Sequence, residues 1–300
     1  MNDFAGKVAV ITGAGSGFGR EFARIGAAHG MKLVLADIQA DALEQTRVEL
    51  EAGGAQVIVR VLDVSDGAQI EALAAASMEA FGGVHLLFNN AGVATSGLVW
   101  ESSVRDWEWT LGVNLWGVIH GVRVFTPLML AAARADPSYR GHIVNTASMA
   151  GLVNQPILGA YNVSKHAVVS LSETLYQDLS LVTDQVHCSV LCPYFVPTGI
   201  NDSQRNRPSN LTNDAQATPS QLIAQAMASK AVTSGKLTAE HIAQLTFDAI
   251  ERDTFYVFSH PHALDSIRQN AENLVALRDP ADPFASKPEL REQLVTALRH

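Results

Sequence analysis

The chain has 300 residues, of which 47% are hydrophobic and 17% are charged. It is therefore long enough to bury a substantial core, and its composition is that of a globular protein and not of a disordered one. The formal net charge of -9 would repel a phosphate polymer or an anionic lipid surface, which disfavours nucleic acid and membranes as partners.

The sequence shows no targeting signal, disulfide or metal motif. No apolar run approaches the ~20 residues that span a bilayer, and residues 1–6 do not resemble a signal peptide, so we expect a soluble, cytoplasmic protein. Cys188 and Cys192 fall on one predicted strand about 13 Å apart, too far for a disulfide. Two cysteines cannot build a zinc site either, so we expect no metal.

Short β-branched runs alternate with longer amphipathic stretches through most of the chain. The runs predict buried strands at 7–12, 32–37, 57–62, 85–89, 142–146, 186–191 and 255–259. The stretches predict helices at 18–29, 40–52, 68–81, 103–133, 159–181 and 239–252. This repeat predicts an α/β fold in a single domain over residues 1–300, built on a doubly wound parallel sheet, or Rossmann fold, that binds ligands at the carboxyl ends of its strands.

The first predicted strand runs into a glycine-rich loop, residues 12–19, that opens the first helix. Glycines let the backbone turn tightly and approach a pyrophosphate, and the helix N-terminus offers that anion free N–H groups. Any tight turn uses glycines, but the position between a strand and a helix favours a dinucleotide. The residues expected to hold it are Gly13, Ser16, Gly17, Phe18 and Gly19.

The second predicted strand ends at Asp37, where a carboxylate would accept both hydroxyls of an adenosine ribose. It would repel a 2′-phosphate by about 1–3 kcal/mol. No Lys or Arg stands between Asp37 and Arg47 to offset this, so we expect NAD and consider NADP less favoured. The alternative is that Asp37 caps the helix beginning near Ala40.

Asp63, which follows the third strand, is a candidate acceptor for the adenine amino group, with Val64 against the ring. An acid in a turn or at a helix cap is the equal alternative for Asp63.

Tyr161-x-x-x-Lys165 begins the predicted helix 159–181, and positions four residues apart share one helix face. A nearby ammonium favours the phenolate and lowers the pKa of a phenol, which makes the pair suited to move a proton to or from a substrate oxygen. Ser148 follows the fifth strand, where its hydroxyl could hold that oxygen. Each residue alone has an ordinary alternative, a helix surface for the pair and a loop or cap for the serine.

Five segments in this order and spacing resemble the short-chain dehydrogenase/reductase family: Thr12-Gly-x-x-x-Gly-x-Gly19, Asn89-Asn-Ala-Gly92, Asn114, Ser148 and Tyr161-x-x-x-Lys165. The resemblance covers roughly residues 5–260. It implies that Tyr161 is the general acid/base, that Lys165 lowers its pKa and holds the nicotinamide ribose, and that Ser148 polarises the carbonyl. It also implies that Asn114 holds a water of a proton relay, and that Asn90, Ala91 and Gly92 lie beneath the cofactor.

The chain departs from the family pattern after the sixth strand, where Pro193-Tyr194 replaces the usual Pro-Gly. The following residues restore much of the pattern, so Pro193, Val196 and Thr198 are expected beside the nicotinamide. Tyr194 fills space that glycine leaves open, and either narrows the substrate cleft or stacks on a ring.

Residues 194–233 are polar and spaced by prolines, which predicts a substrate lid with one short helix at 221–230. Residues 261–300 form a C-terminal extension with two short helices around its prolines. Together with residues 201–207, this extension is similar to that of family members acting on bulky aromatic secondary alcohols. The alternative is that it packs as an extra interface helix. The expected apolar cleft wall is Met149, Leu152, Leu158, Tyr194, Phe195 and Ile200. No cation stands among these residues, although Arg205 or Arg207 could enter from the lid.

Our first hypothesis is an NAD-dependent enzyme that oxidises a hydrophobic secondary alcohol or reduces its ketone, with Ser148, Tyr161, Tyr194 and Leu158 against the substrate. Aromatic secondary alcohols are the candidates within this class. The alternatives are an NADPH-dependent carbonyl reductase and a nucleotide-sensing protein without turnover. The predicted helices 103–133 and 159–181 carry several nonpolar faces, as Leu171, Leu175, Leu179 and Val182 suggest. We expect them to pair with other subunits in a tetramer or dimer.

Overall fold

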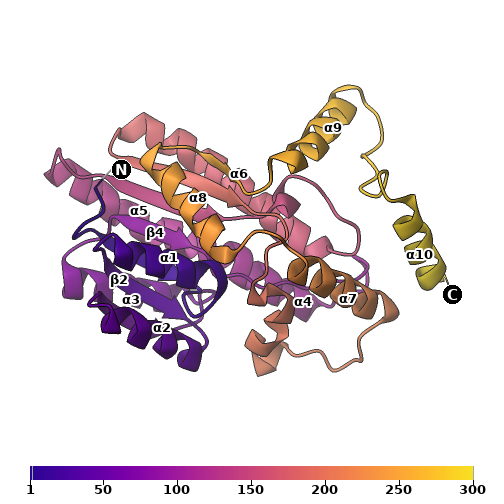
Figure 1. Ribbon diagram of the computed structural model, residues 1–300, viewed down its shortest axis with the longest axis horizontal. Coiled ribbons are helices and arrows are strands. Elements are labelled where there is room, and N and C mark those ends of the chain that lie inside the picture. Colours follow the sequence, from indigo (N-terminus) through magenta and orange to yellow (C-terminus); the bar gives the residue numbers. More distant parts are fainter. Residues whose placement is uncertain (2, 300) are drawn as a thin grey trace.

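The computed structural model describes residues 1 and 3–299, and its centre is one parallel sheet between two layers of helices (Figure 1). In these residues seven strands pair in the order β3-β2-β1-β4-β5-β6-β7, every pair parallel. The strands are β1 (Val8–Thr12), β2 (Lys32–Asp37), β3 (Gln56–Val61), β4 (Leu86–Asn89), β5 (Gly141–Thr146), β6 (Val186–Cys192) and β7 (Tyr256–Phe258). The predicted doubly wound sheet is confirmed.

The helices are α1 (Gly17–Ala28), α2 (Ala40–Ala52), α3 (Gly67–Phe81), α4 (Val104–Leu111), α5 (Gly117–Ala135), α6 (Gly159–Val182), α7 (Pro219–Thr233), α8 (Ala239–Glu251), α9 (Leu264–Val275) and α10 (Pro288–Arg299). Helices α1 to α8 lie in the connections between these strands, and α9 and α10 follow the last strand. Cap residues mark the helix ends. The N-cap of α3 is Asp66, whose carboxylate accepts from Ala68 N, and its C-cap is Gly82, whose φ is 75°. A left-handed residue at this place is the usual role of glycine.

The alternation of β1 explains the two layers. Ala9 and Ile11 pack on one face with α1, α2 and α8, whereas Val8 and Val10 pack on the other face with α3, α5 and α6. All five residues of β1 are buried, as expected for a strand covered on both sides. Cys188 and Cys192 are buried free thiols on β6, as predicted.

From β1 the chain adds β2 and β3 on one side of the sheet, and from β4 it adds β5, β6 and β7 on the other side. The strand order therefore reverses between the neighbouring strands β1 and β4. In open α/β sheets this switch point opens a crevice at the carboxyl ends of the strands. The glycine loop follows β1 and the Asn89–Gly92 segment follows β4, so both predicted motifs lie at this crevice.

The predicted helix 103–133 is continuous but irregular. A π-helical segment, η1 (Gly112–Trp116), joins α4 to α5, and π segments inside helices are frequent at functional sites. The combined run Val104–Ala135 meets the length and hydropathy criterion of a membrane span, with a mean hydropathy of 1.4 in its most apolar window. The expectation that no run approaches that criterion is therefore wrong for this helix. Within the most apolar stretch of this helix, 28% of the residues are buried inside the chain.

The lid contains more structure than predicted. Two short 3-10 segments, η3 (Gly199–Asn206) and η4 (Ser209–Leu211), precede α7, which extends the predicted helix 221–230 at both ends. Thr218 and Gln221 form a capping box that sequence patterning did not reveal, and this box starts α7. The C-terminal extension holds the two expected helices, α9 and α10, which reach away from the sheet in Figure 1.

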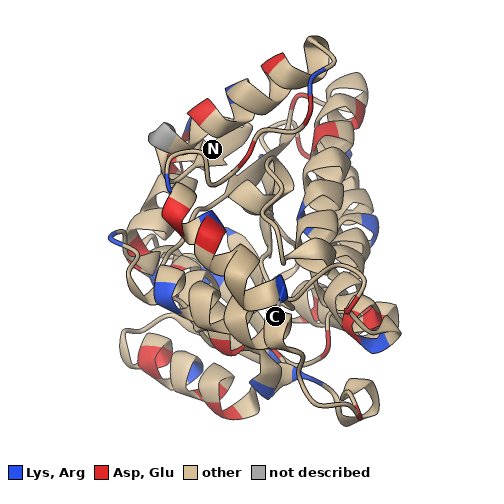
Figure 2. Cartoon of the chain, turned by 90° about the vertical axis from the view of Figure 1, so that its right-hand side faces the viewer, with Lys and Arg blue, Asp and Glu red and all other residues tan. Residues whose placement is uncertain are grey.

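Charges on the surface are mixed. Figure 2 shows Lys and Arg interspersed with Asp and Glu along the helices of the face that it presents. Many of them pair within or between neighbouring helices, as Arg24 does with Glu49 and Arg47 with Glu44. Exposed pairs of this kind contribute little to stability, about 0–1 kcal/mol each.

Candidate active site

The glycine loop is held in a form that leaves the start of α1 open to a ligand. Gly13 and Gly17 have positive φ values of 67° and 53°, and a Cβ on Gly19 would lie 2.1 Å from the carbonyl oxygen of Gly13. Ser16 is the N-cap residue of α1, yet its side chain accepts no hydrogen bond from the described residues of the helix. The loop therefore fits a pyrophosphate, because the first-turn N–H groups lack a side-chain cap.

Asp37 organises the other side of this loop. Its Oδ2 accepts from Gly15 N at 2.8 Å and its Oδ1 accepts from Gln39 N at 2.9 Å. The N-cap of α2 is Gln39, so the helix-cap alternative for Asp37 is wrong. Two of about four acceptor positions of the carboxylate are used, which leaves lone pairs for ribose hydroxyls.

Asp63 and Val64 lie where adenine was expected, along the same cleft. The Oδ1 of Asp63 accepts from both the N–H and the hydroxyl of Ser65. One oxygen of the carboxylate therefore has the predicted turn role. The helix cap of α3 is Asp66 instead. Val64 is 7% exposed and packs against the core.

Ser148 and Tyr161 meet at the far end of the cleft. Ser148 is the N-cap of a 3-10 turn, η2 (Met149–Gly151), and its Oγ accepts from Ala150 N at 3.1 Å. Burial raises the pKa of the Tyr161 phenol, and a hydrogen bond with Ser148 opposes that rise. Desolvation of the phenolate is the larger of these two effects. That Lys165 and an oxidised nicotinamide together lower this pKa stays a prediction.

Lys165 lies one turn along α6 from Tyr161, with its Nζ 5.7 Å from the centre of the phenol ring. The ammonium is buried and donates to the carbonyl of Thr146 at 2.9 Å. Burial lowers the pKa of Lys165 to about 8, while the neighbouring Cys192 opposes that shift. A buried cation with one protein acceptor is able to donate further hydrogen bonds into the cleft.

Asn114 lies on the π segment and is fully buried. Its amide donates to Val93 O and to Ser164 Oγ, and its Oδ1 accepts from Val93 N at 2.8 Å. The side chain thus joins η1 to the segment that follows β4 and to α6. Both amide donors are used, so a water held by this side chain would have to donate to the remaining lone pair of Oδ1.

The segment after β4 is bound to the glycine loop. Asn90 donates to the carbonyl of Thr12 at 3.0 Å, and its backbone N–H donates to the hydroxyl of Thr12 at 2.9 Å. A Cβ on Gly13 would lie 2.9 Å from the Cα of Ala91. These contacts fix the two loops of the switch point against each other.

One cleft of about 380 Å³ joins these residues. The predicted cofactor and catalytic residues that line it are Gly13, Ser16, Gly17, Phe18, Asp37, Asp63, Val64, Asn90, Ala91, Gly92, Ser148, Tyr161, Lys165, Pro193, Val196 and Thr198. Gly19 and Asn114 lie behind this lining and shape it from within the fold.

The predicted apolar wall is mostly present. Met149, Leu158, Phe195 and Ile200 line the cleft, whereas Leu152 does not and packs in the core under η2. Tyr194 also lines the cleft and packs against two rings, with centroids 4.7 Å from Phe195 and 5.6 Å from His260. Both contacts are edge-on or tilted, so neither of these two rings is stacked on Tyr194. That Tyr194 narrows the cleft stays a prediction.

Other cleft residues escaped sequence reasoning, because no motif marks them. Arg20, Trp109, Gln155, Asn206, Ala228 and Val232 are among these lining residues. The spacing of Ala228 and Val232 on one face of α7 is a signal that would have found two of them. Arg205 also reaches the lining, but its guanidinium donates to the carbonyls of Gly199 and Asp202.

A sequence model of the short chain dehydrogenase family matches residues 7–209. The chain belongs to the short-chain dehydrogenase family. A CLA biosynthesis dehydrogenase/reductase from Lactiplantibacillus plantarum is 34% identical over 92% of this chain and 95% of its own length. A C alpha-dehydrogenase from Sphingobium sp. is 31% identical over 99% of this chain and 94% of its own.

A solved structure supports the same assignment. The short-chain dehydrogenase/reductase from Burkholderia phymatum in complex with NAD is 57% identical and superposes with a TM-score of 0.92. The match covers 94% of this chain and 99% of that one. This short-chain dehydrogenase is therefore an oxidoreductase of the Rossmann fold, as the sequence motifs indicated.

Proposed function

We propose that this enzyme oxidises a hydrophobic secondary alcohol, or reduces the matching ketone, with NAD as the hydride carrier. The observation that carries the proposal is the convergence of Ser148, Tyr161 and Lys165 on a single cleft whose opposite end is closed by Asp37. NAD, when bound, accepts or returns the hydride. The chain supplies the site for the dinucleotide, the proton transfer and the walls.

The preference for NAD rests on Asp37. Its carboxylate faces the cleft beside the glycine loop and would repel a 2′-phosphate. A similar protein from Burkholderia phymatum was solved in complex with NAD, which agrees with this choice.

Arg20 is the observation that favours the alternative, an NADPH-dependent reductase, because it lines the same end of the cleft. However, its guanidinium donates to the carbonyl of Gly15 at 2.7 Å and to the hydroxyl of Thr46 at 3.1 Å. These bonds hold the guanidinium of Arg20 against the glycine loop and α2. NAD therefore remains our first choice.

The proton transfer is assigned to Tyr161. In the oxidising direction the phenolate accepts the hydroxyl proton, while Ser148 holds the substrate oxygen. Because burial raises the pKa of the phenol, a positive charge must counter that effect. Lys165 supplies one such charge 5.7 Å from the phenol ring, and Asn114 fixes the helix turn beside it through Ser164.

The substrate class follows from the walls. Trp109, Met149, Leu158, Phe195 and Val232 are apolar, and Arg205 is bonded to lid carbonyls, so the cleft favours a neutral, hydrophobic molecule. Tyr194 offers an aromatic edge at the rim. The relative from Sphingobium, a C alpha-dehydrogenase, is consistent with alcohol oxidation.

The proposal is tested by mixing purified enzyme with NAD or NADP and a panel of secondary alcohols, and by following reduced-nicotinamide absorbance. We expect turnover with NAD and bulky apolar alcohols. Tight NAD binding without turnover on any alcohol or ketone would favour the nucleotide-sensing alternative instead.

We also propose that the enzyme is a cytoplasmic homo-oligomer that pairs through α4, α5 and α6. The faces differ from those predicted: Leu175 and Leu179 are buried in the core of their own chain, and Leu171 is partly buried. The exposed apolar residues on this side are Val104, Trp116, Val163, Tyr176, Leu181 and Val182. Light scattering of wild type and Trp116→Glu tests this, and we expect the variant to dissociate.

A further inference from the structure

The lid forms several side-chain hydrogen bonds with residues 94–106 of the body, which we call the anchor segment. Ala94 N donates to Ser203 Oγ at 3.1 Å, and Leu98 N donates to Ser220 Oγ at 2.9 Å. Glu101 accepts from the hydroxyls of Thr218 and Ser220. Polar contacts of this kind therefore join the lid to the anchor segment at several points.

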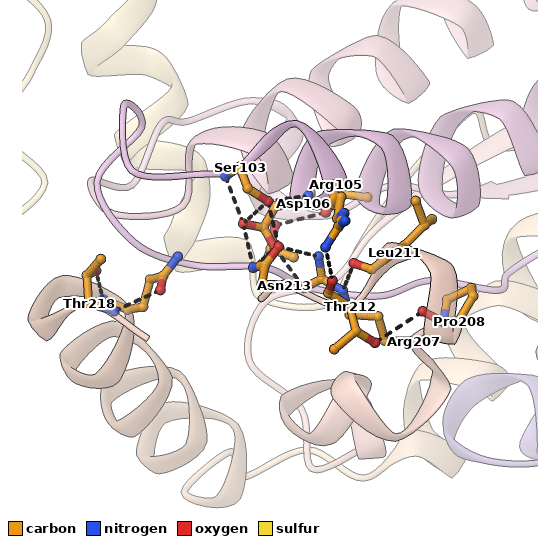
Figure 3. A network of polar contacts seen from close by, with 12 residues as sticks. Ser103, Arg105, Asp106, Arg207, Pro208, Leu211, Thr212, Asn213 and Thr218 are labelled. Atoms are coloured by element: carbon orange, nitrogen blue, oxygen red, sulfur yellow. Dashed lines mark hydrogen bonds and ion pairs between the residues drawn. The ribbon is translucent and has the colours of Figure 1, made fainter. Parts of the chain in front are cut away.

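The centre of this attachment is an ion pair between Arg207 of the lid and Asp106 of α4 (Figure 3). The Nη1 of Arg207 lies 2.7 Å from Asp106 Oδ1, and the two side chains are only 6% and 5% exposed. Arg207 also donates from Nε to Leu211 O and from Nη2 to Asn213. Its fork is thus fully directed toward the lid and Asp106.

Asp106 has a second role in α4. Its Oδ2 accepts from the N–H and hydroxyl of Ser103, which completes the capping box of the helix, while Oδ1 accepts from Arg207 and Asn213. One carboxylate therefore joins the start of α4 to the lid. The backbone N–H bond from Ser103, together with Arg207, holds the pKa of Asp106 below its usual range against the effect of burial.

One face of the helix links the Arg207–Asp106 pair to the cleft. Trp109 lies three residues after Asp106 and Val113 four residues after Trp109, so the three side chains share one face. Trp109 and Val113 line the cleft, and the guanidinium of Arg207 lies 5.0 Å from the centre of the indole. The guanidinium of Arg207 thus lies over the ring of Trp109, and Trp109 lines the cleft.

A second cavity borders the Arg207–Asp106 pair. Residues of both the anchor segment and the lid line it, among them the polar Glu101, Arg105, Asn213 and Gln225. A buried charge that loses its partner is costly, and here the cost is relieved if the lid lifts and water enters from this side.

We propose that the Arg207–Asp106 pair is a clasp that keeps the lid closed and sets Trp109 as a wall for bulky substrates. Arg207 is then a positioning residue, which acts on the substrate through Trp109 and the lid. The kinetic part of this inference rests on the proposed function, whereas the structural part does not.

The test compares the full-length variants Arg207→Met, Arg207→Lys and Asp106→Asn with Arg105→Met as the matched control. Arg105 also pairs with the lid, at Asp214, but both side chains are exposed. Hydrogen–deuterium exchange of residues 199–221 should rise about tenfold in Arg207→Met and less than about twofold in the control, because only the buried pair is costly to break. Arg207→Lys should fall between them, since it keeps the charge and loses the fork.

The kinetic arm uses NAD with a small and a bulky secondary alcohol. In Arg207→Met we expect the KM for the bulky alcohol to rise about tenfold, with kcat and the KM for the small alcohol changed less than about twofold. A purely structural role would not separate the two alcohols.

Exchange in Arg207→Met equal to that in Arg105→Met would overturn the clasp. If Arg207→Met also accelerates exchange in β4 and β5, Arg207→Lys decides: faster exchange confined to the lid supports the clasp, and faster exchange throughout overturns it. If wild type oxidises no alcohol, the proposed function fails while the exchange result still judges the clasp.

Discussion

The two ends of the cleft are built from different parts of the polypeptide. At the cofactor end, backbone lies against backbone: Gly19 touches the carbonyl of Gly13, and Gly13 touches Ala91. At the substrate end, a lid is bound to the body by side chains, among them the buried pair of Arg207 and Asp106.

This difference indicates that the glycine loop provides precise geometry and that the lid determines which substrates fit. A backbone cradle leaves almost no freedom, which suits one invariable dinucleotide. A lid held by side-chain bonds is able to change its walls while the cradle stays intact. Tyr161 and Lys165 line the same cleft as residues of both ends.

The largest expected effect tests the residue where the two ends meet. Tyr161→Phe removes the hydroxyl that we propose transfers the proton, and we expect kcat to fall by about 10²–10⁴ while the Kd for NAD changes little. Stopped-flow absorbance and NAD titration measure the two quantities. Tyr176→Phe, the same change on an exposed part of α6, is the control. Near-native turnover of Tyr161→Phe would remove the phenol from the mechanism.

The backbone cradle is tested by Gly19→Ala. A Cβ there would lie 2.1 Å from Gly13 O, so the loop must shift and NAD affinity should fall by about 100-fold. Gly83→Ala is the control, because the nearest atom to its Cβ is 3.9 Å away. Calorimetric titration of NAD compares them. Equal affinity in the two variants would mean that the cradle is softer than its contacts indicate.

The charge at the cofactor end is tested by Asp37→Ala. Loss of the carboxylate should raise the Kd for NAD by about 10-fold and lower the preference for NAD over NADP, since repulsion of the 2′-phosphate disappears. Asp41→Ala, on the exposed first turn of α2, is the matched control. An unchanged ratio of the two affinities would contradict the assignment of Asp37.

The smallest expected effect concerns stability and pH. His85 accepts a hydrogen bond from Val8 N at 3.1 Å, and burial together with Lys7 and Lys32 lowers its pKa to about 4. The unfolded chain, with a pKa near 6.5, binds more protons between these values, so stability is lost as the pH falls from about 6.5 to 4.

Urea denaturation at pH 7 and pH 5 measures this loss. We expect the difference in midpoint to be smaller in His85→Asn than in wild type, because the variant has no imidazole to protonate. Exposed His241→Asn should behave as wild type does. A wild-type midpoint that does not fall at pH 5 would contradict the shift.

The sequence predicted the cofactor end well because its signals are local. Each strand was placed within one residue at its ends, and the glycine loop and Asp37 follow strands that their own composition marks. The burial of Leu175 and Leu179 was missed, because an apolar helix face does not show whether it packs inward or outward.

The substrate end could not be predicted in the same way. Asp106 and Arg207 are 101 positions apart, and no spacing rule connects them. The π segment at Asn114 leaves no mark in hydropathy. The pKa of Tyr161 also depends on how deeply the fold desolvates the phenol, and residue spacing does not show that burial.

The double use of Asp106 has a consequence for protein engineering. Because one carboxylate both starts α4 and receives the lid, a lid grafted from another enzyme would leave that helix with an unmatched acid. The natural unit of exchange is therefore a cassette of two pieces, residues 94–113 and 199–233, transplanted together. Chimeras that respect this unit should inherit a new selectivity with their old cofactor.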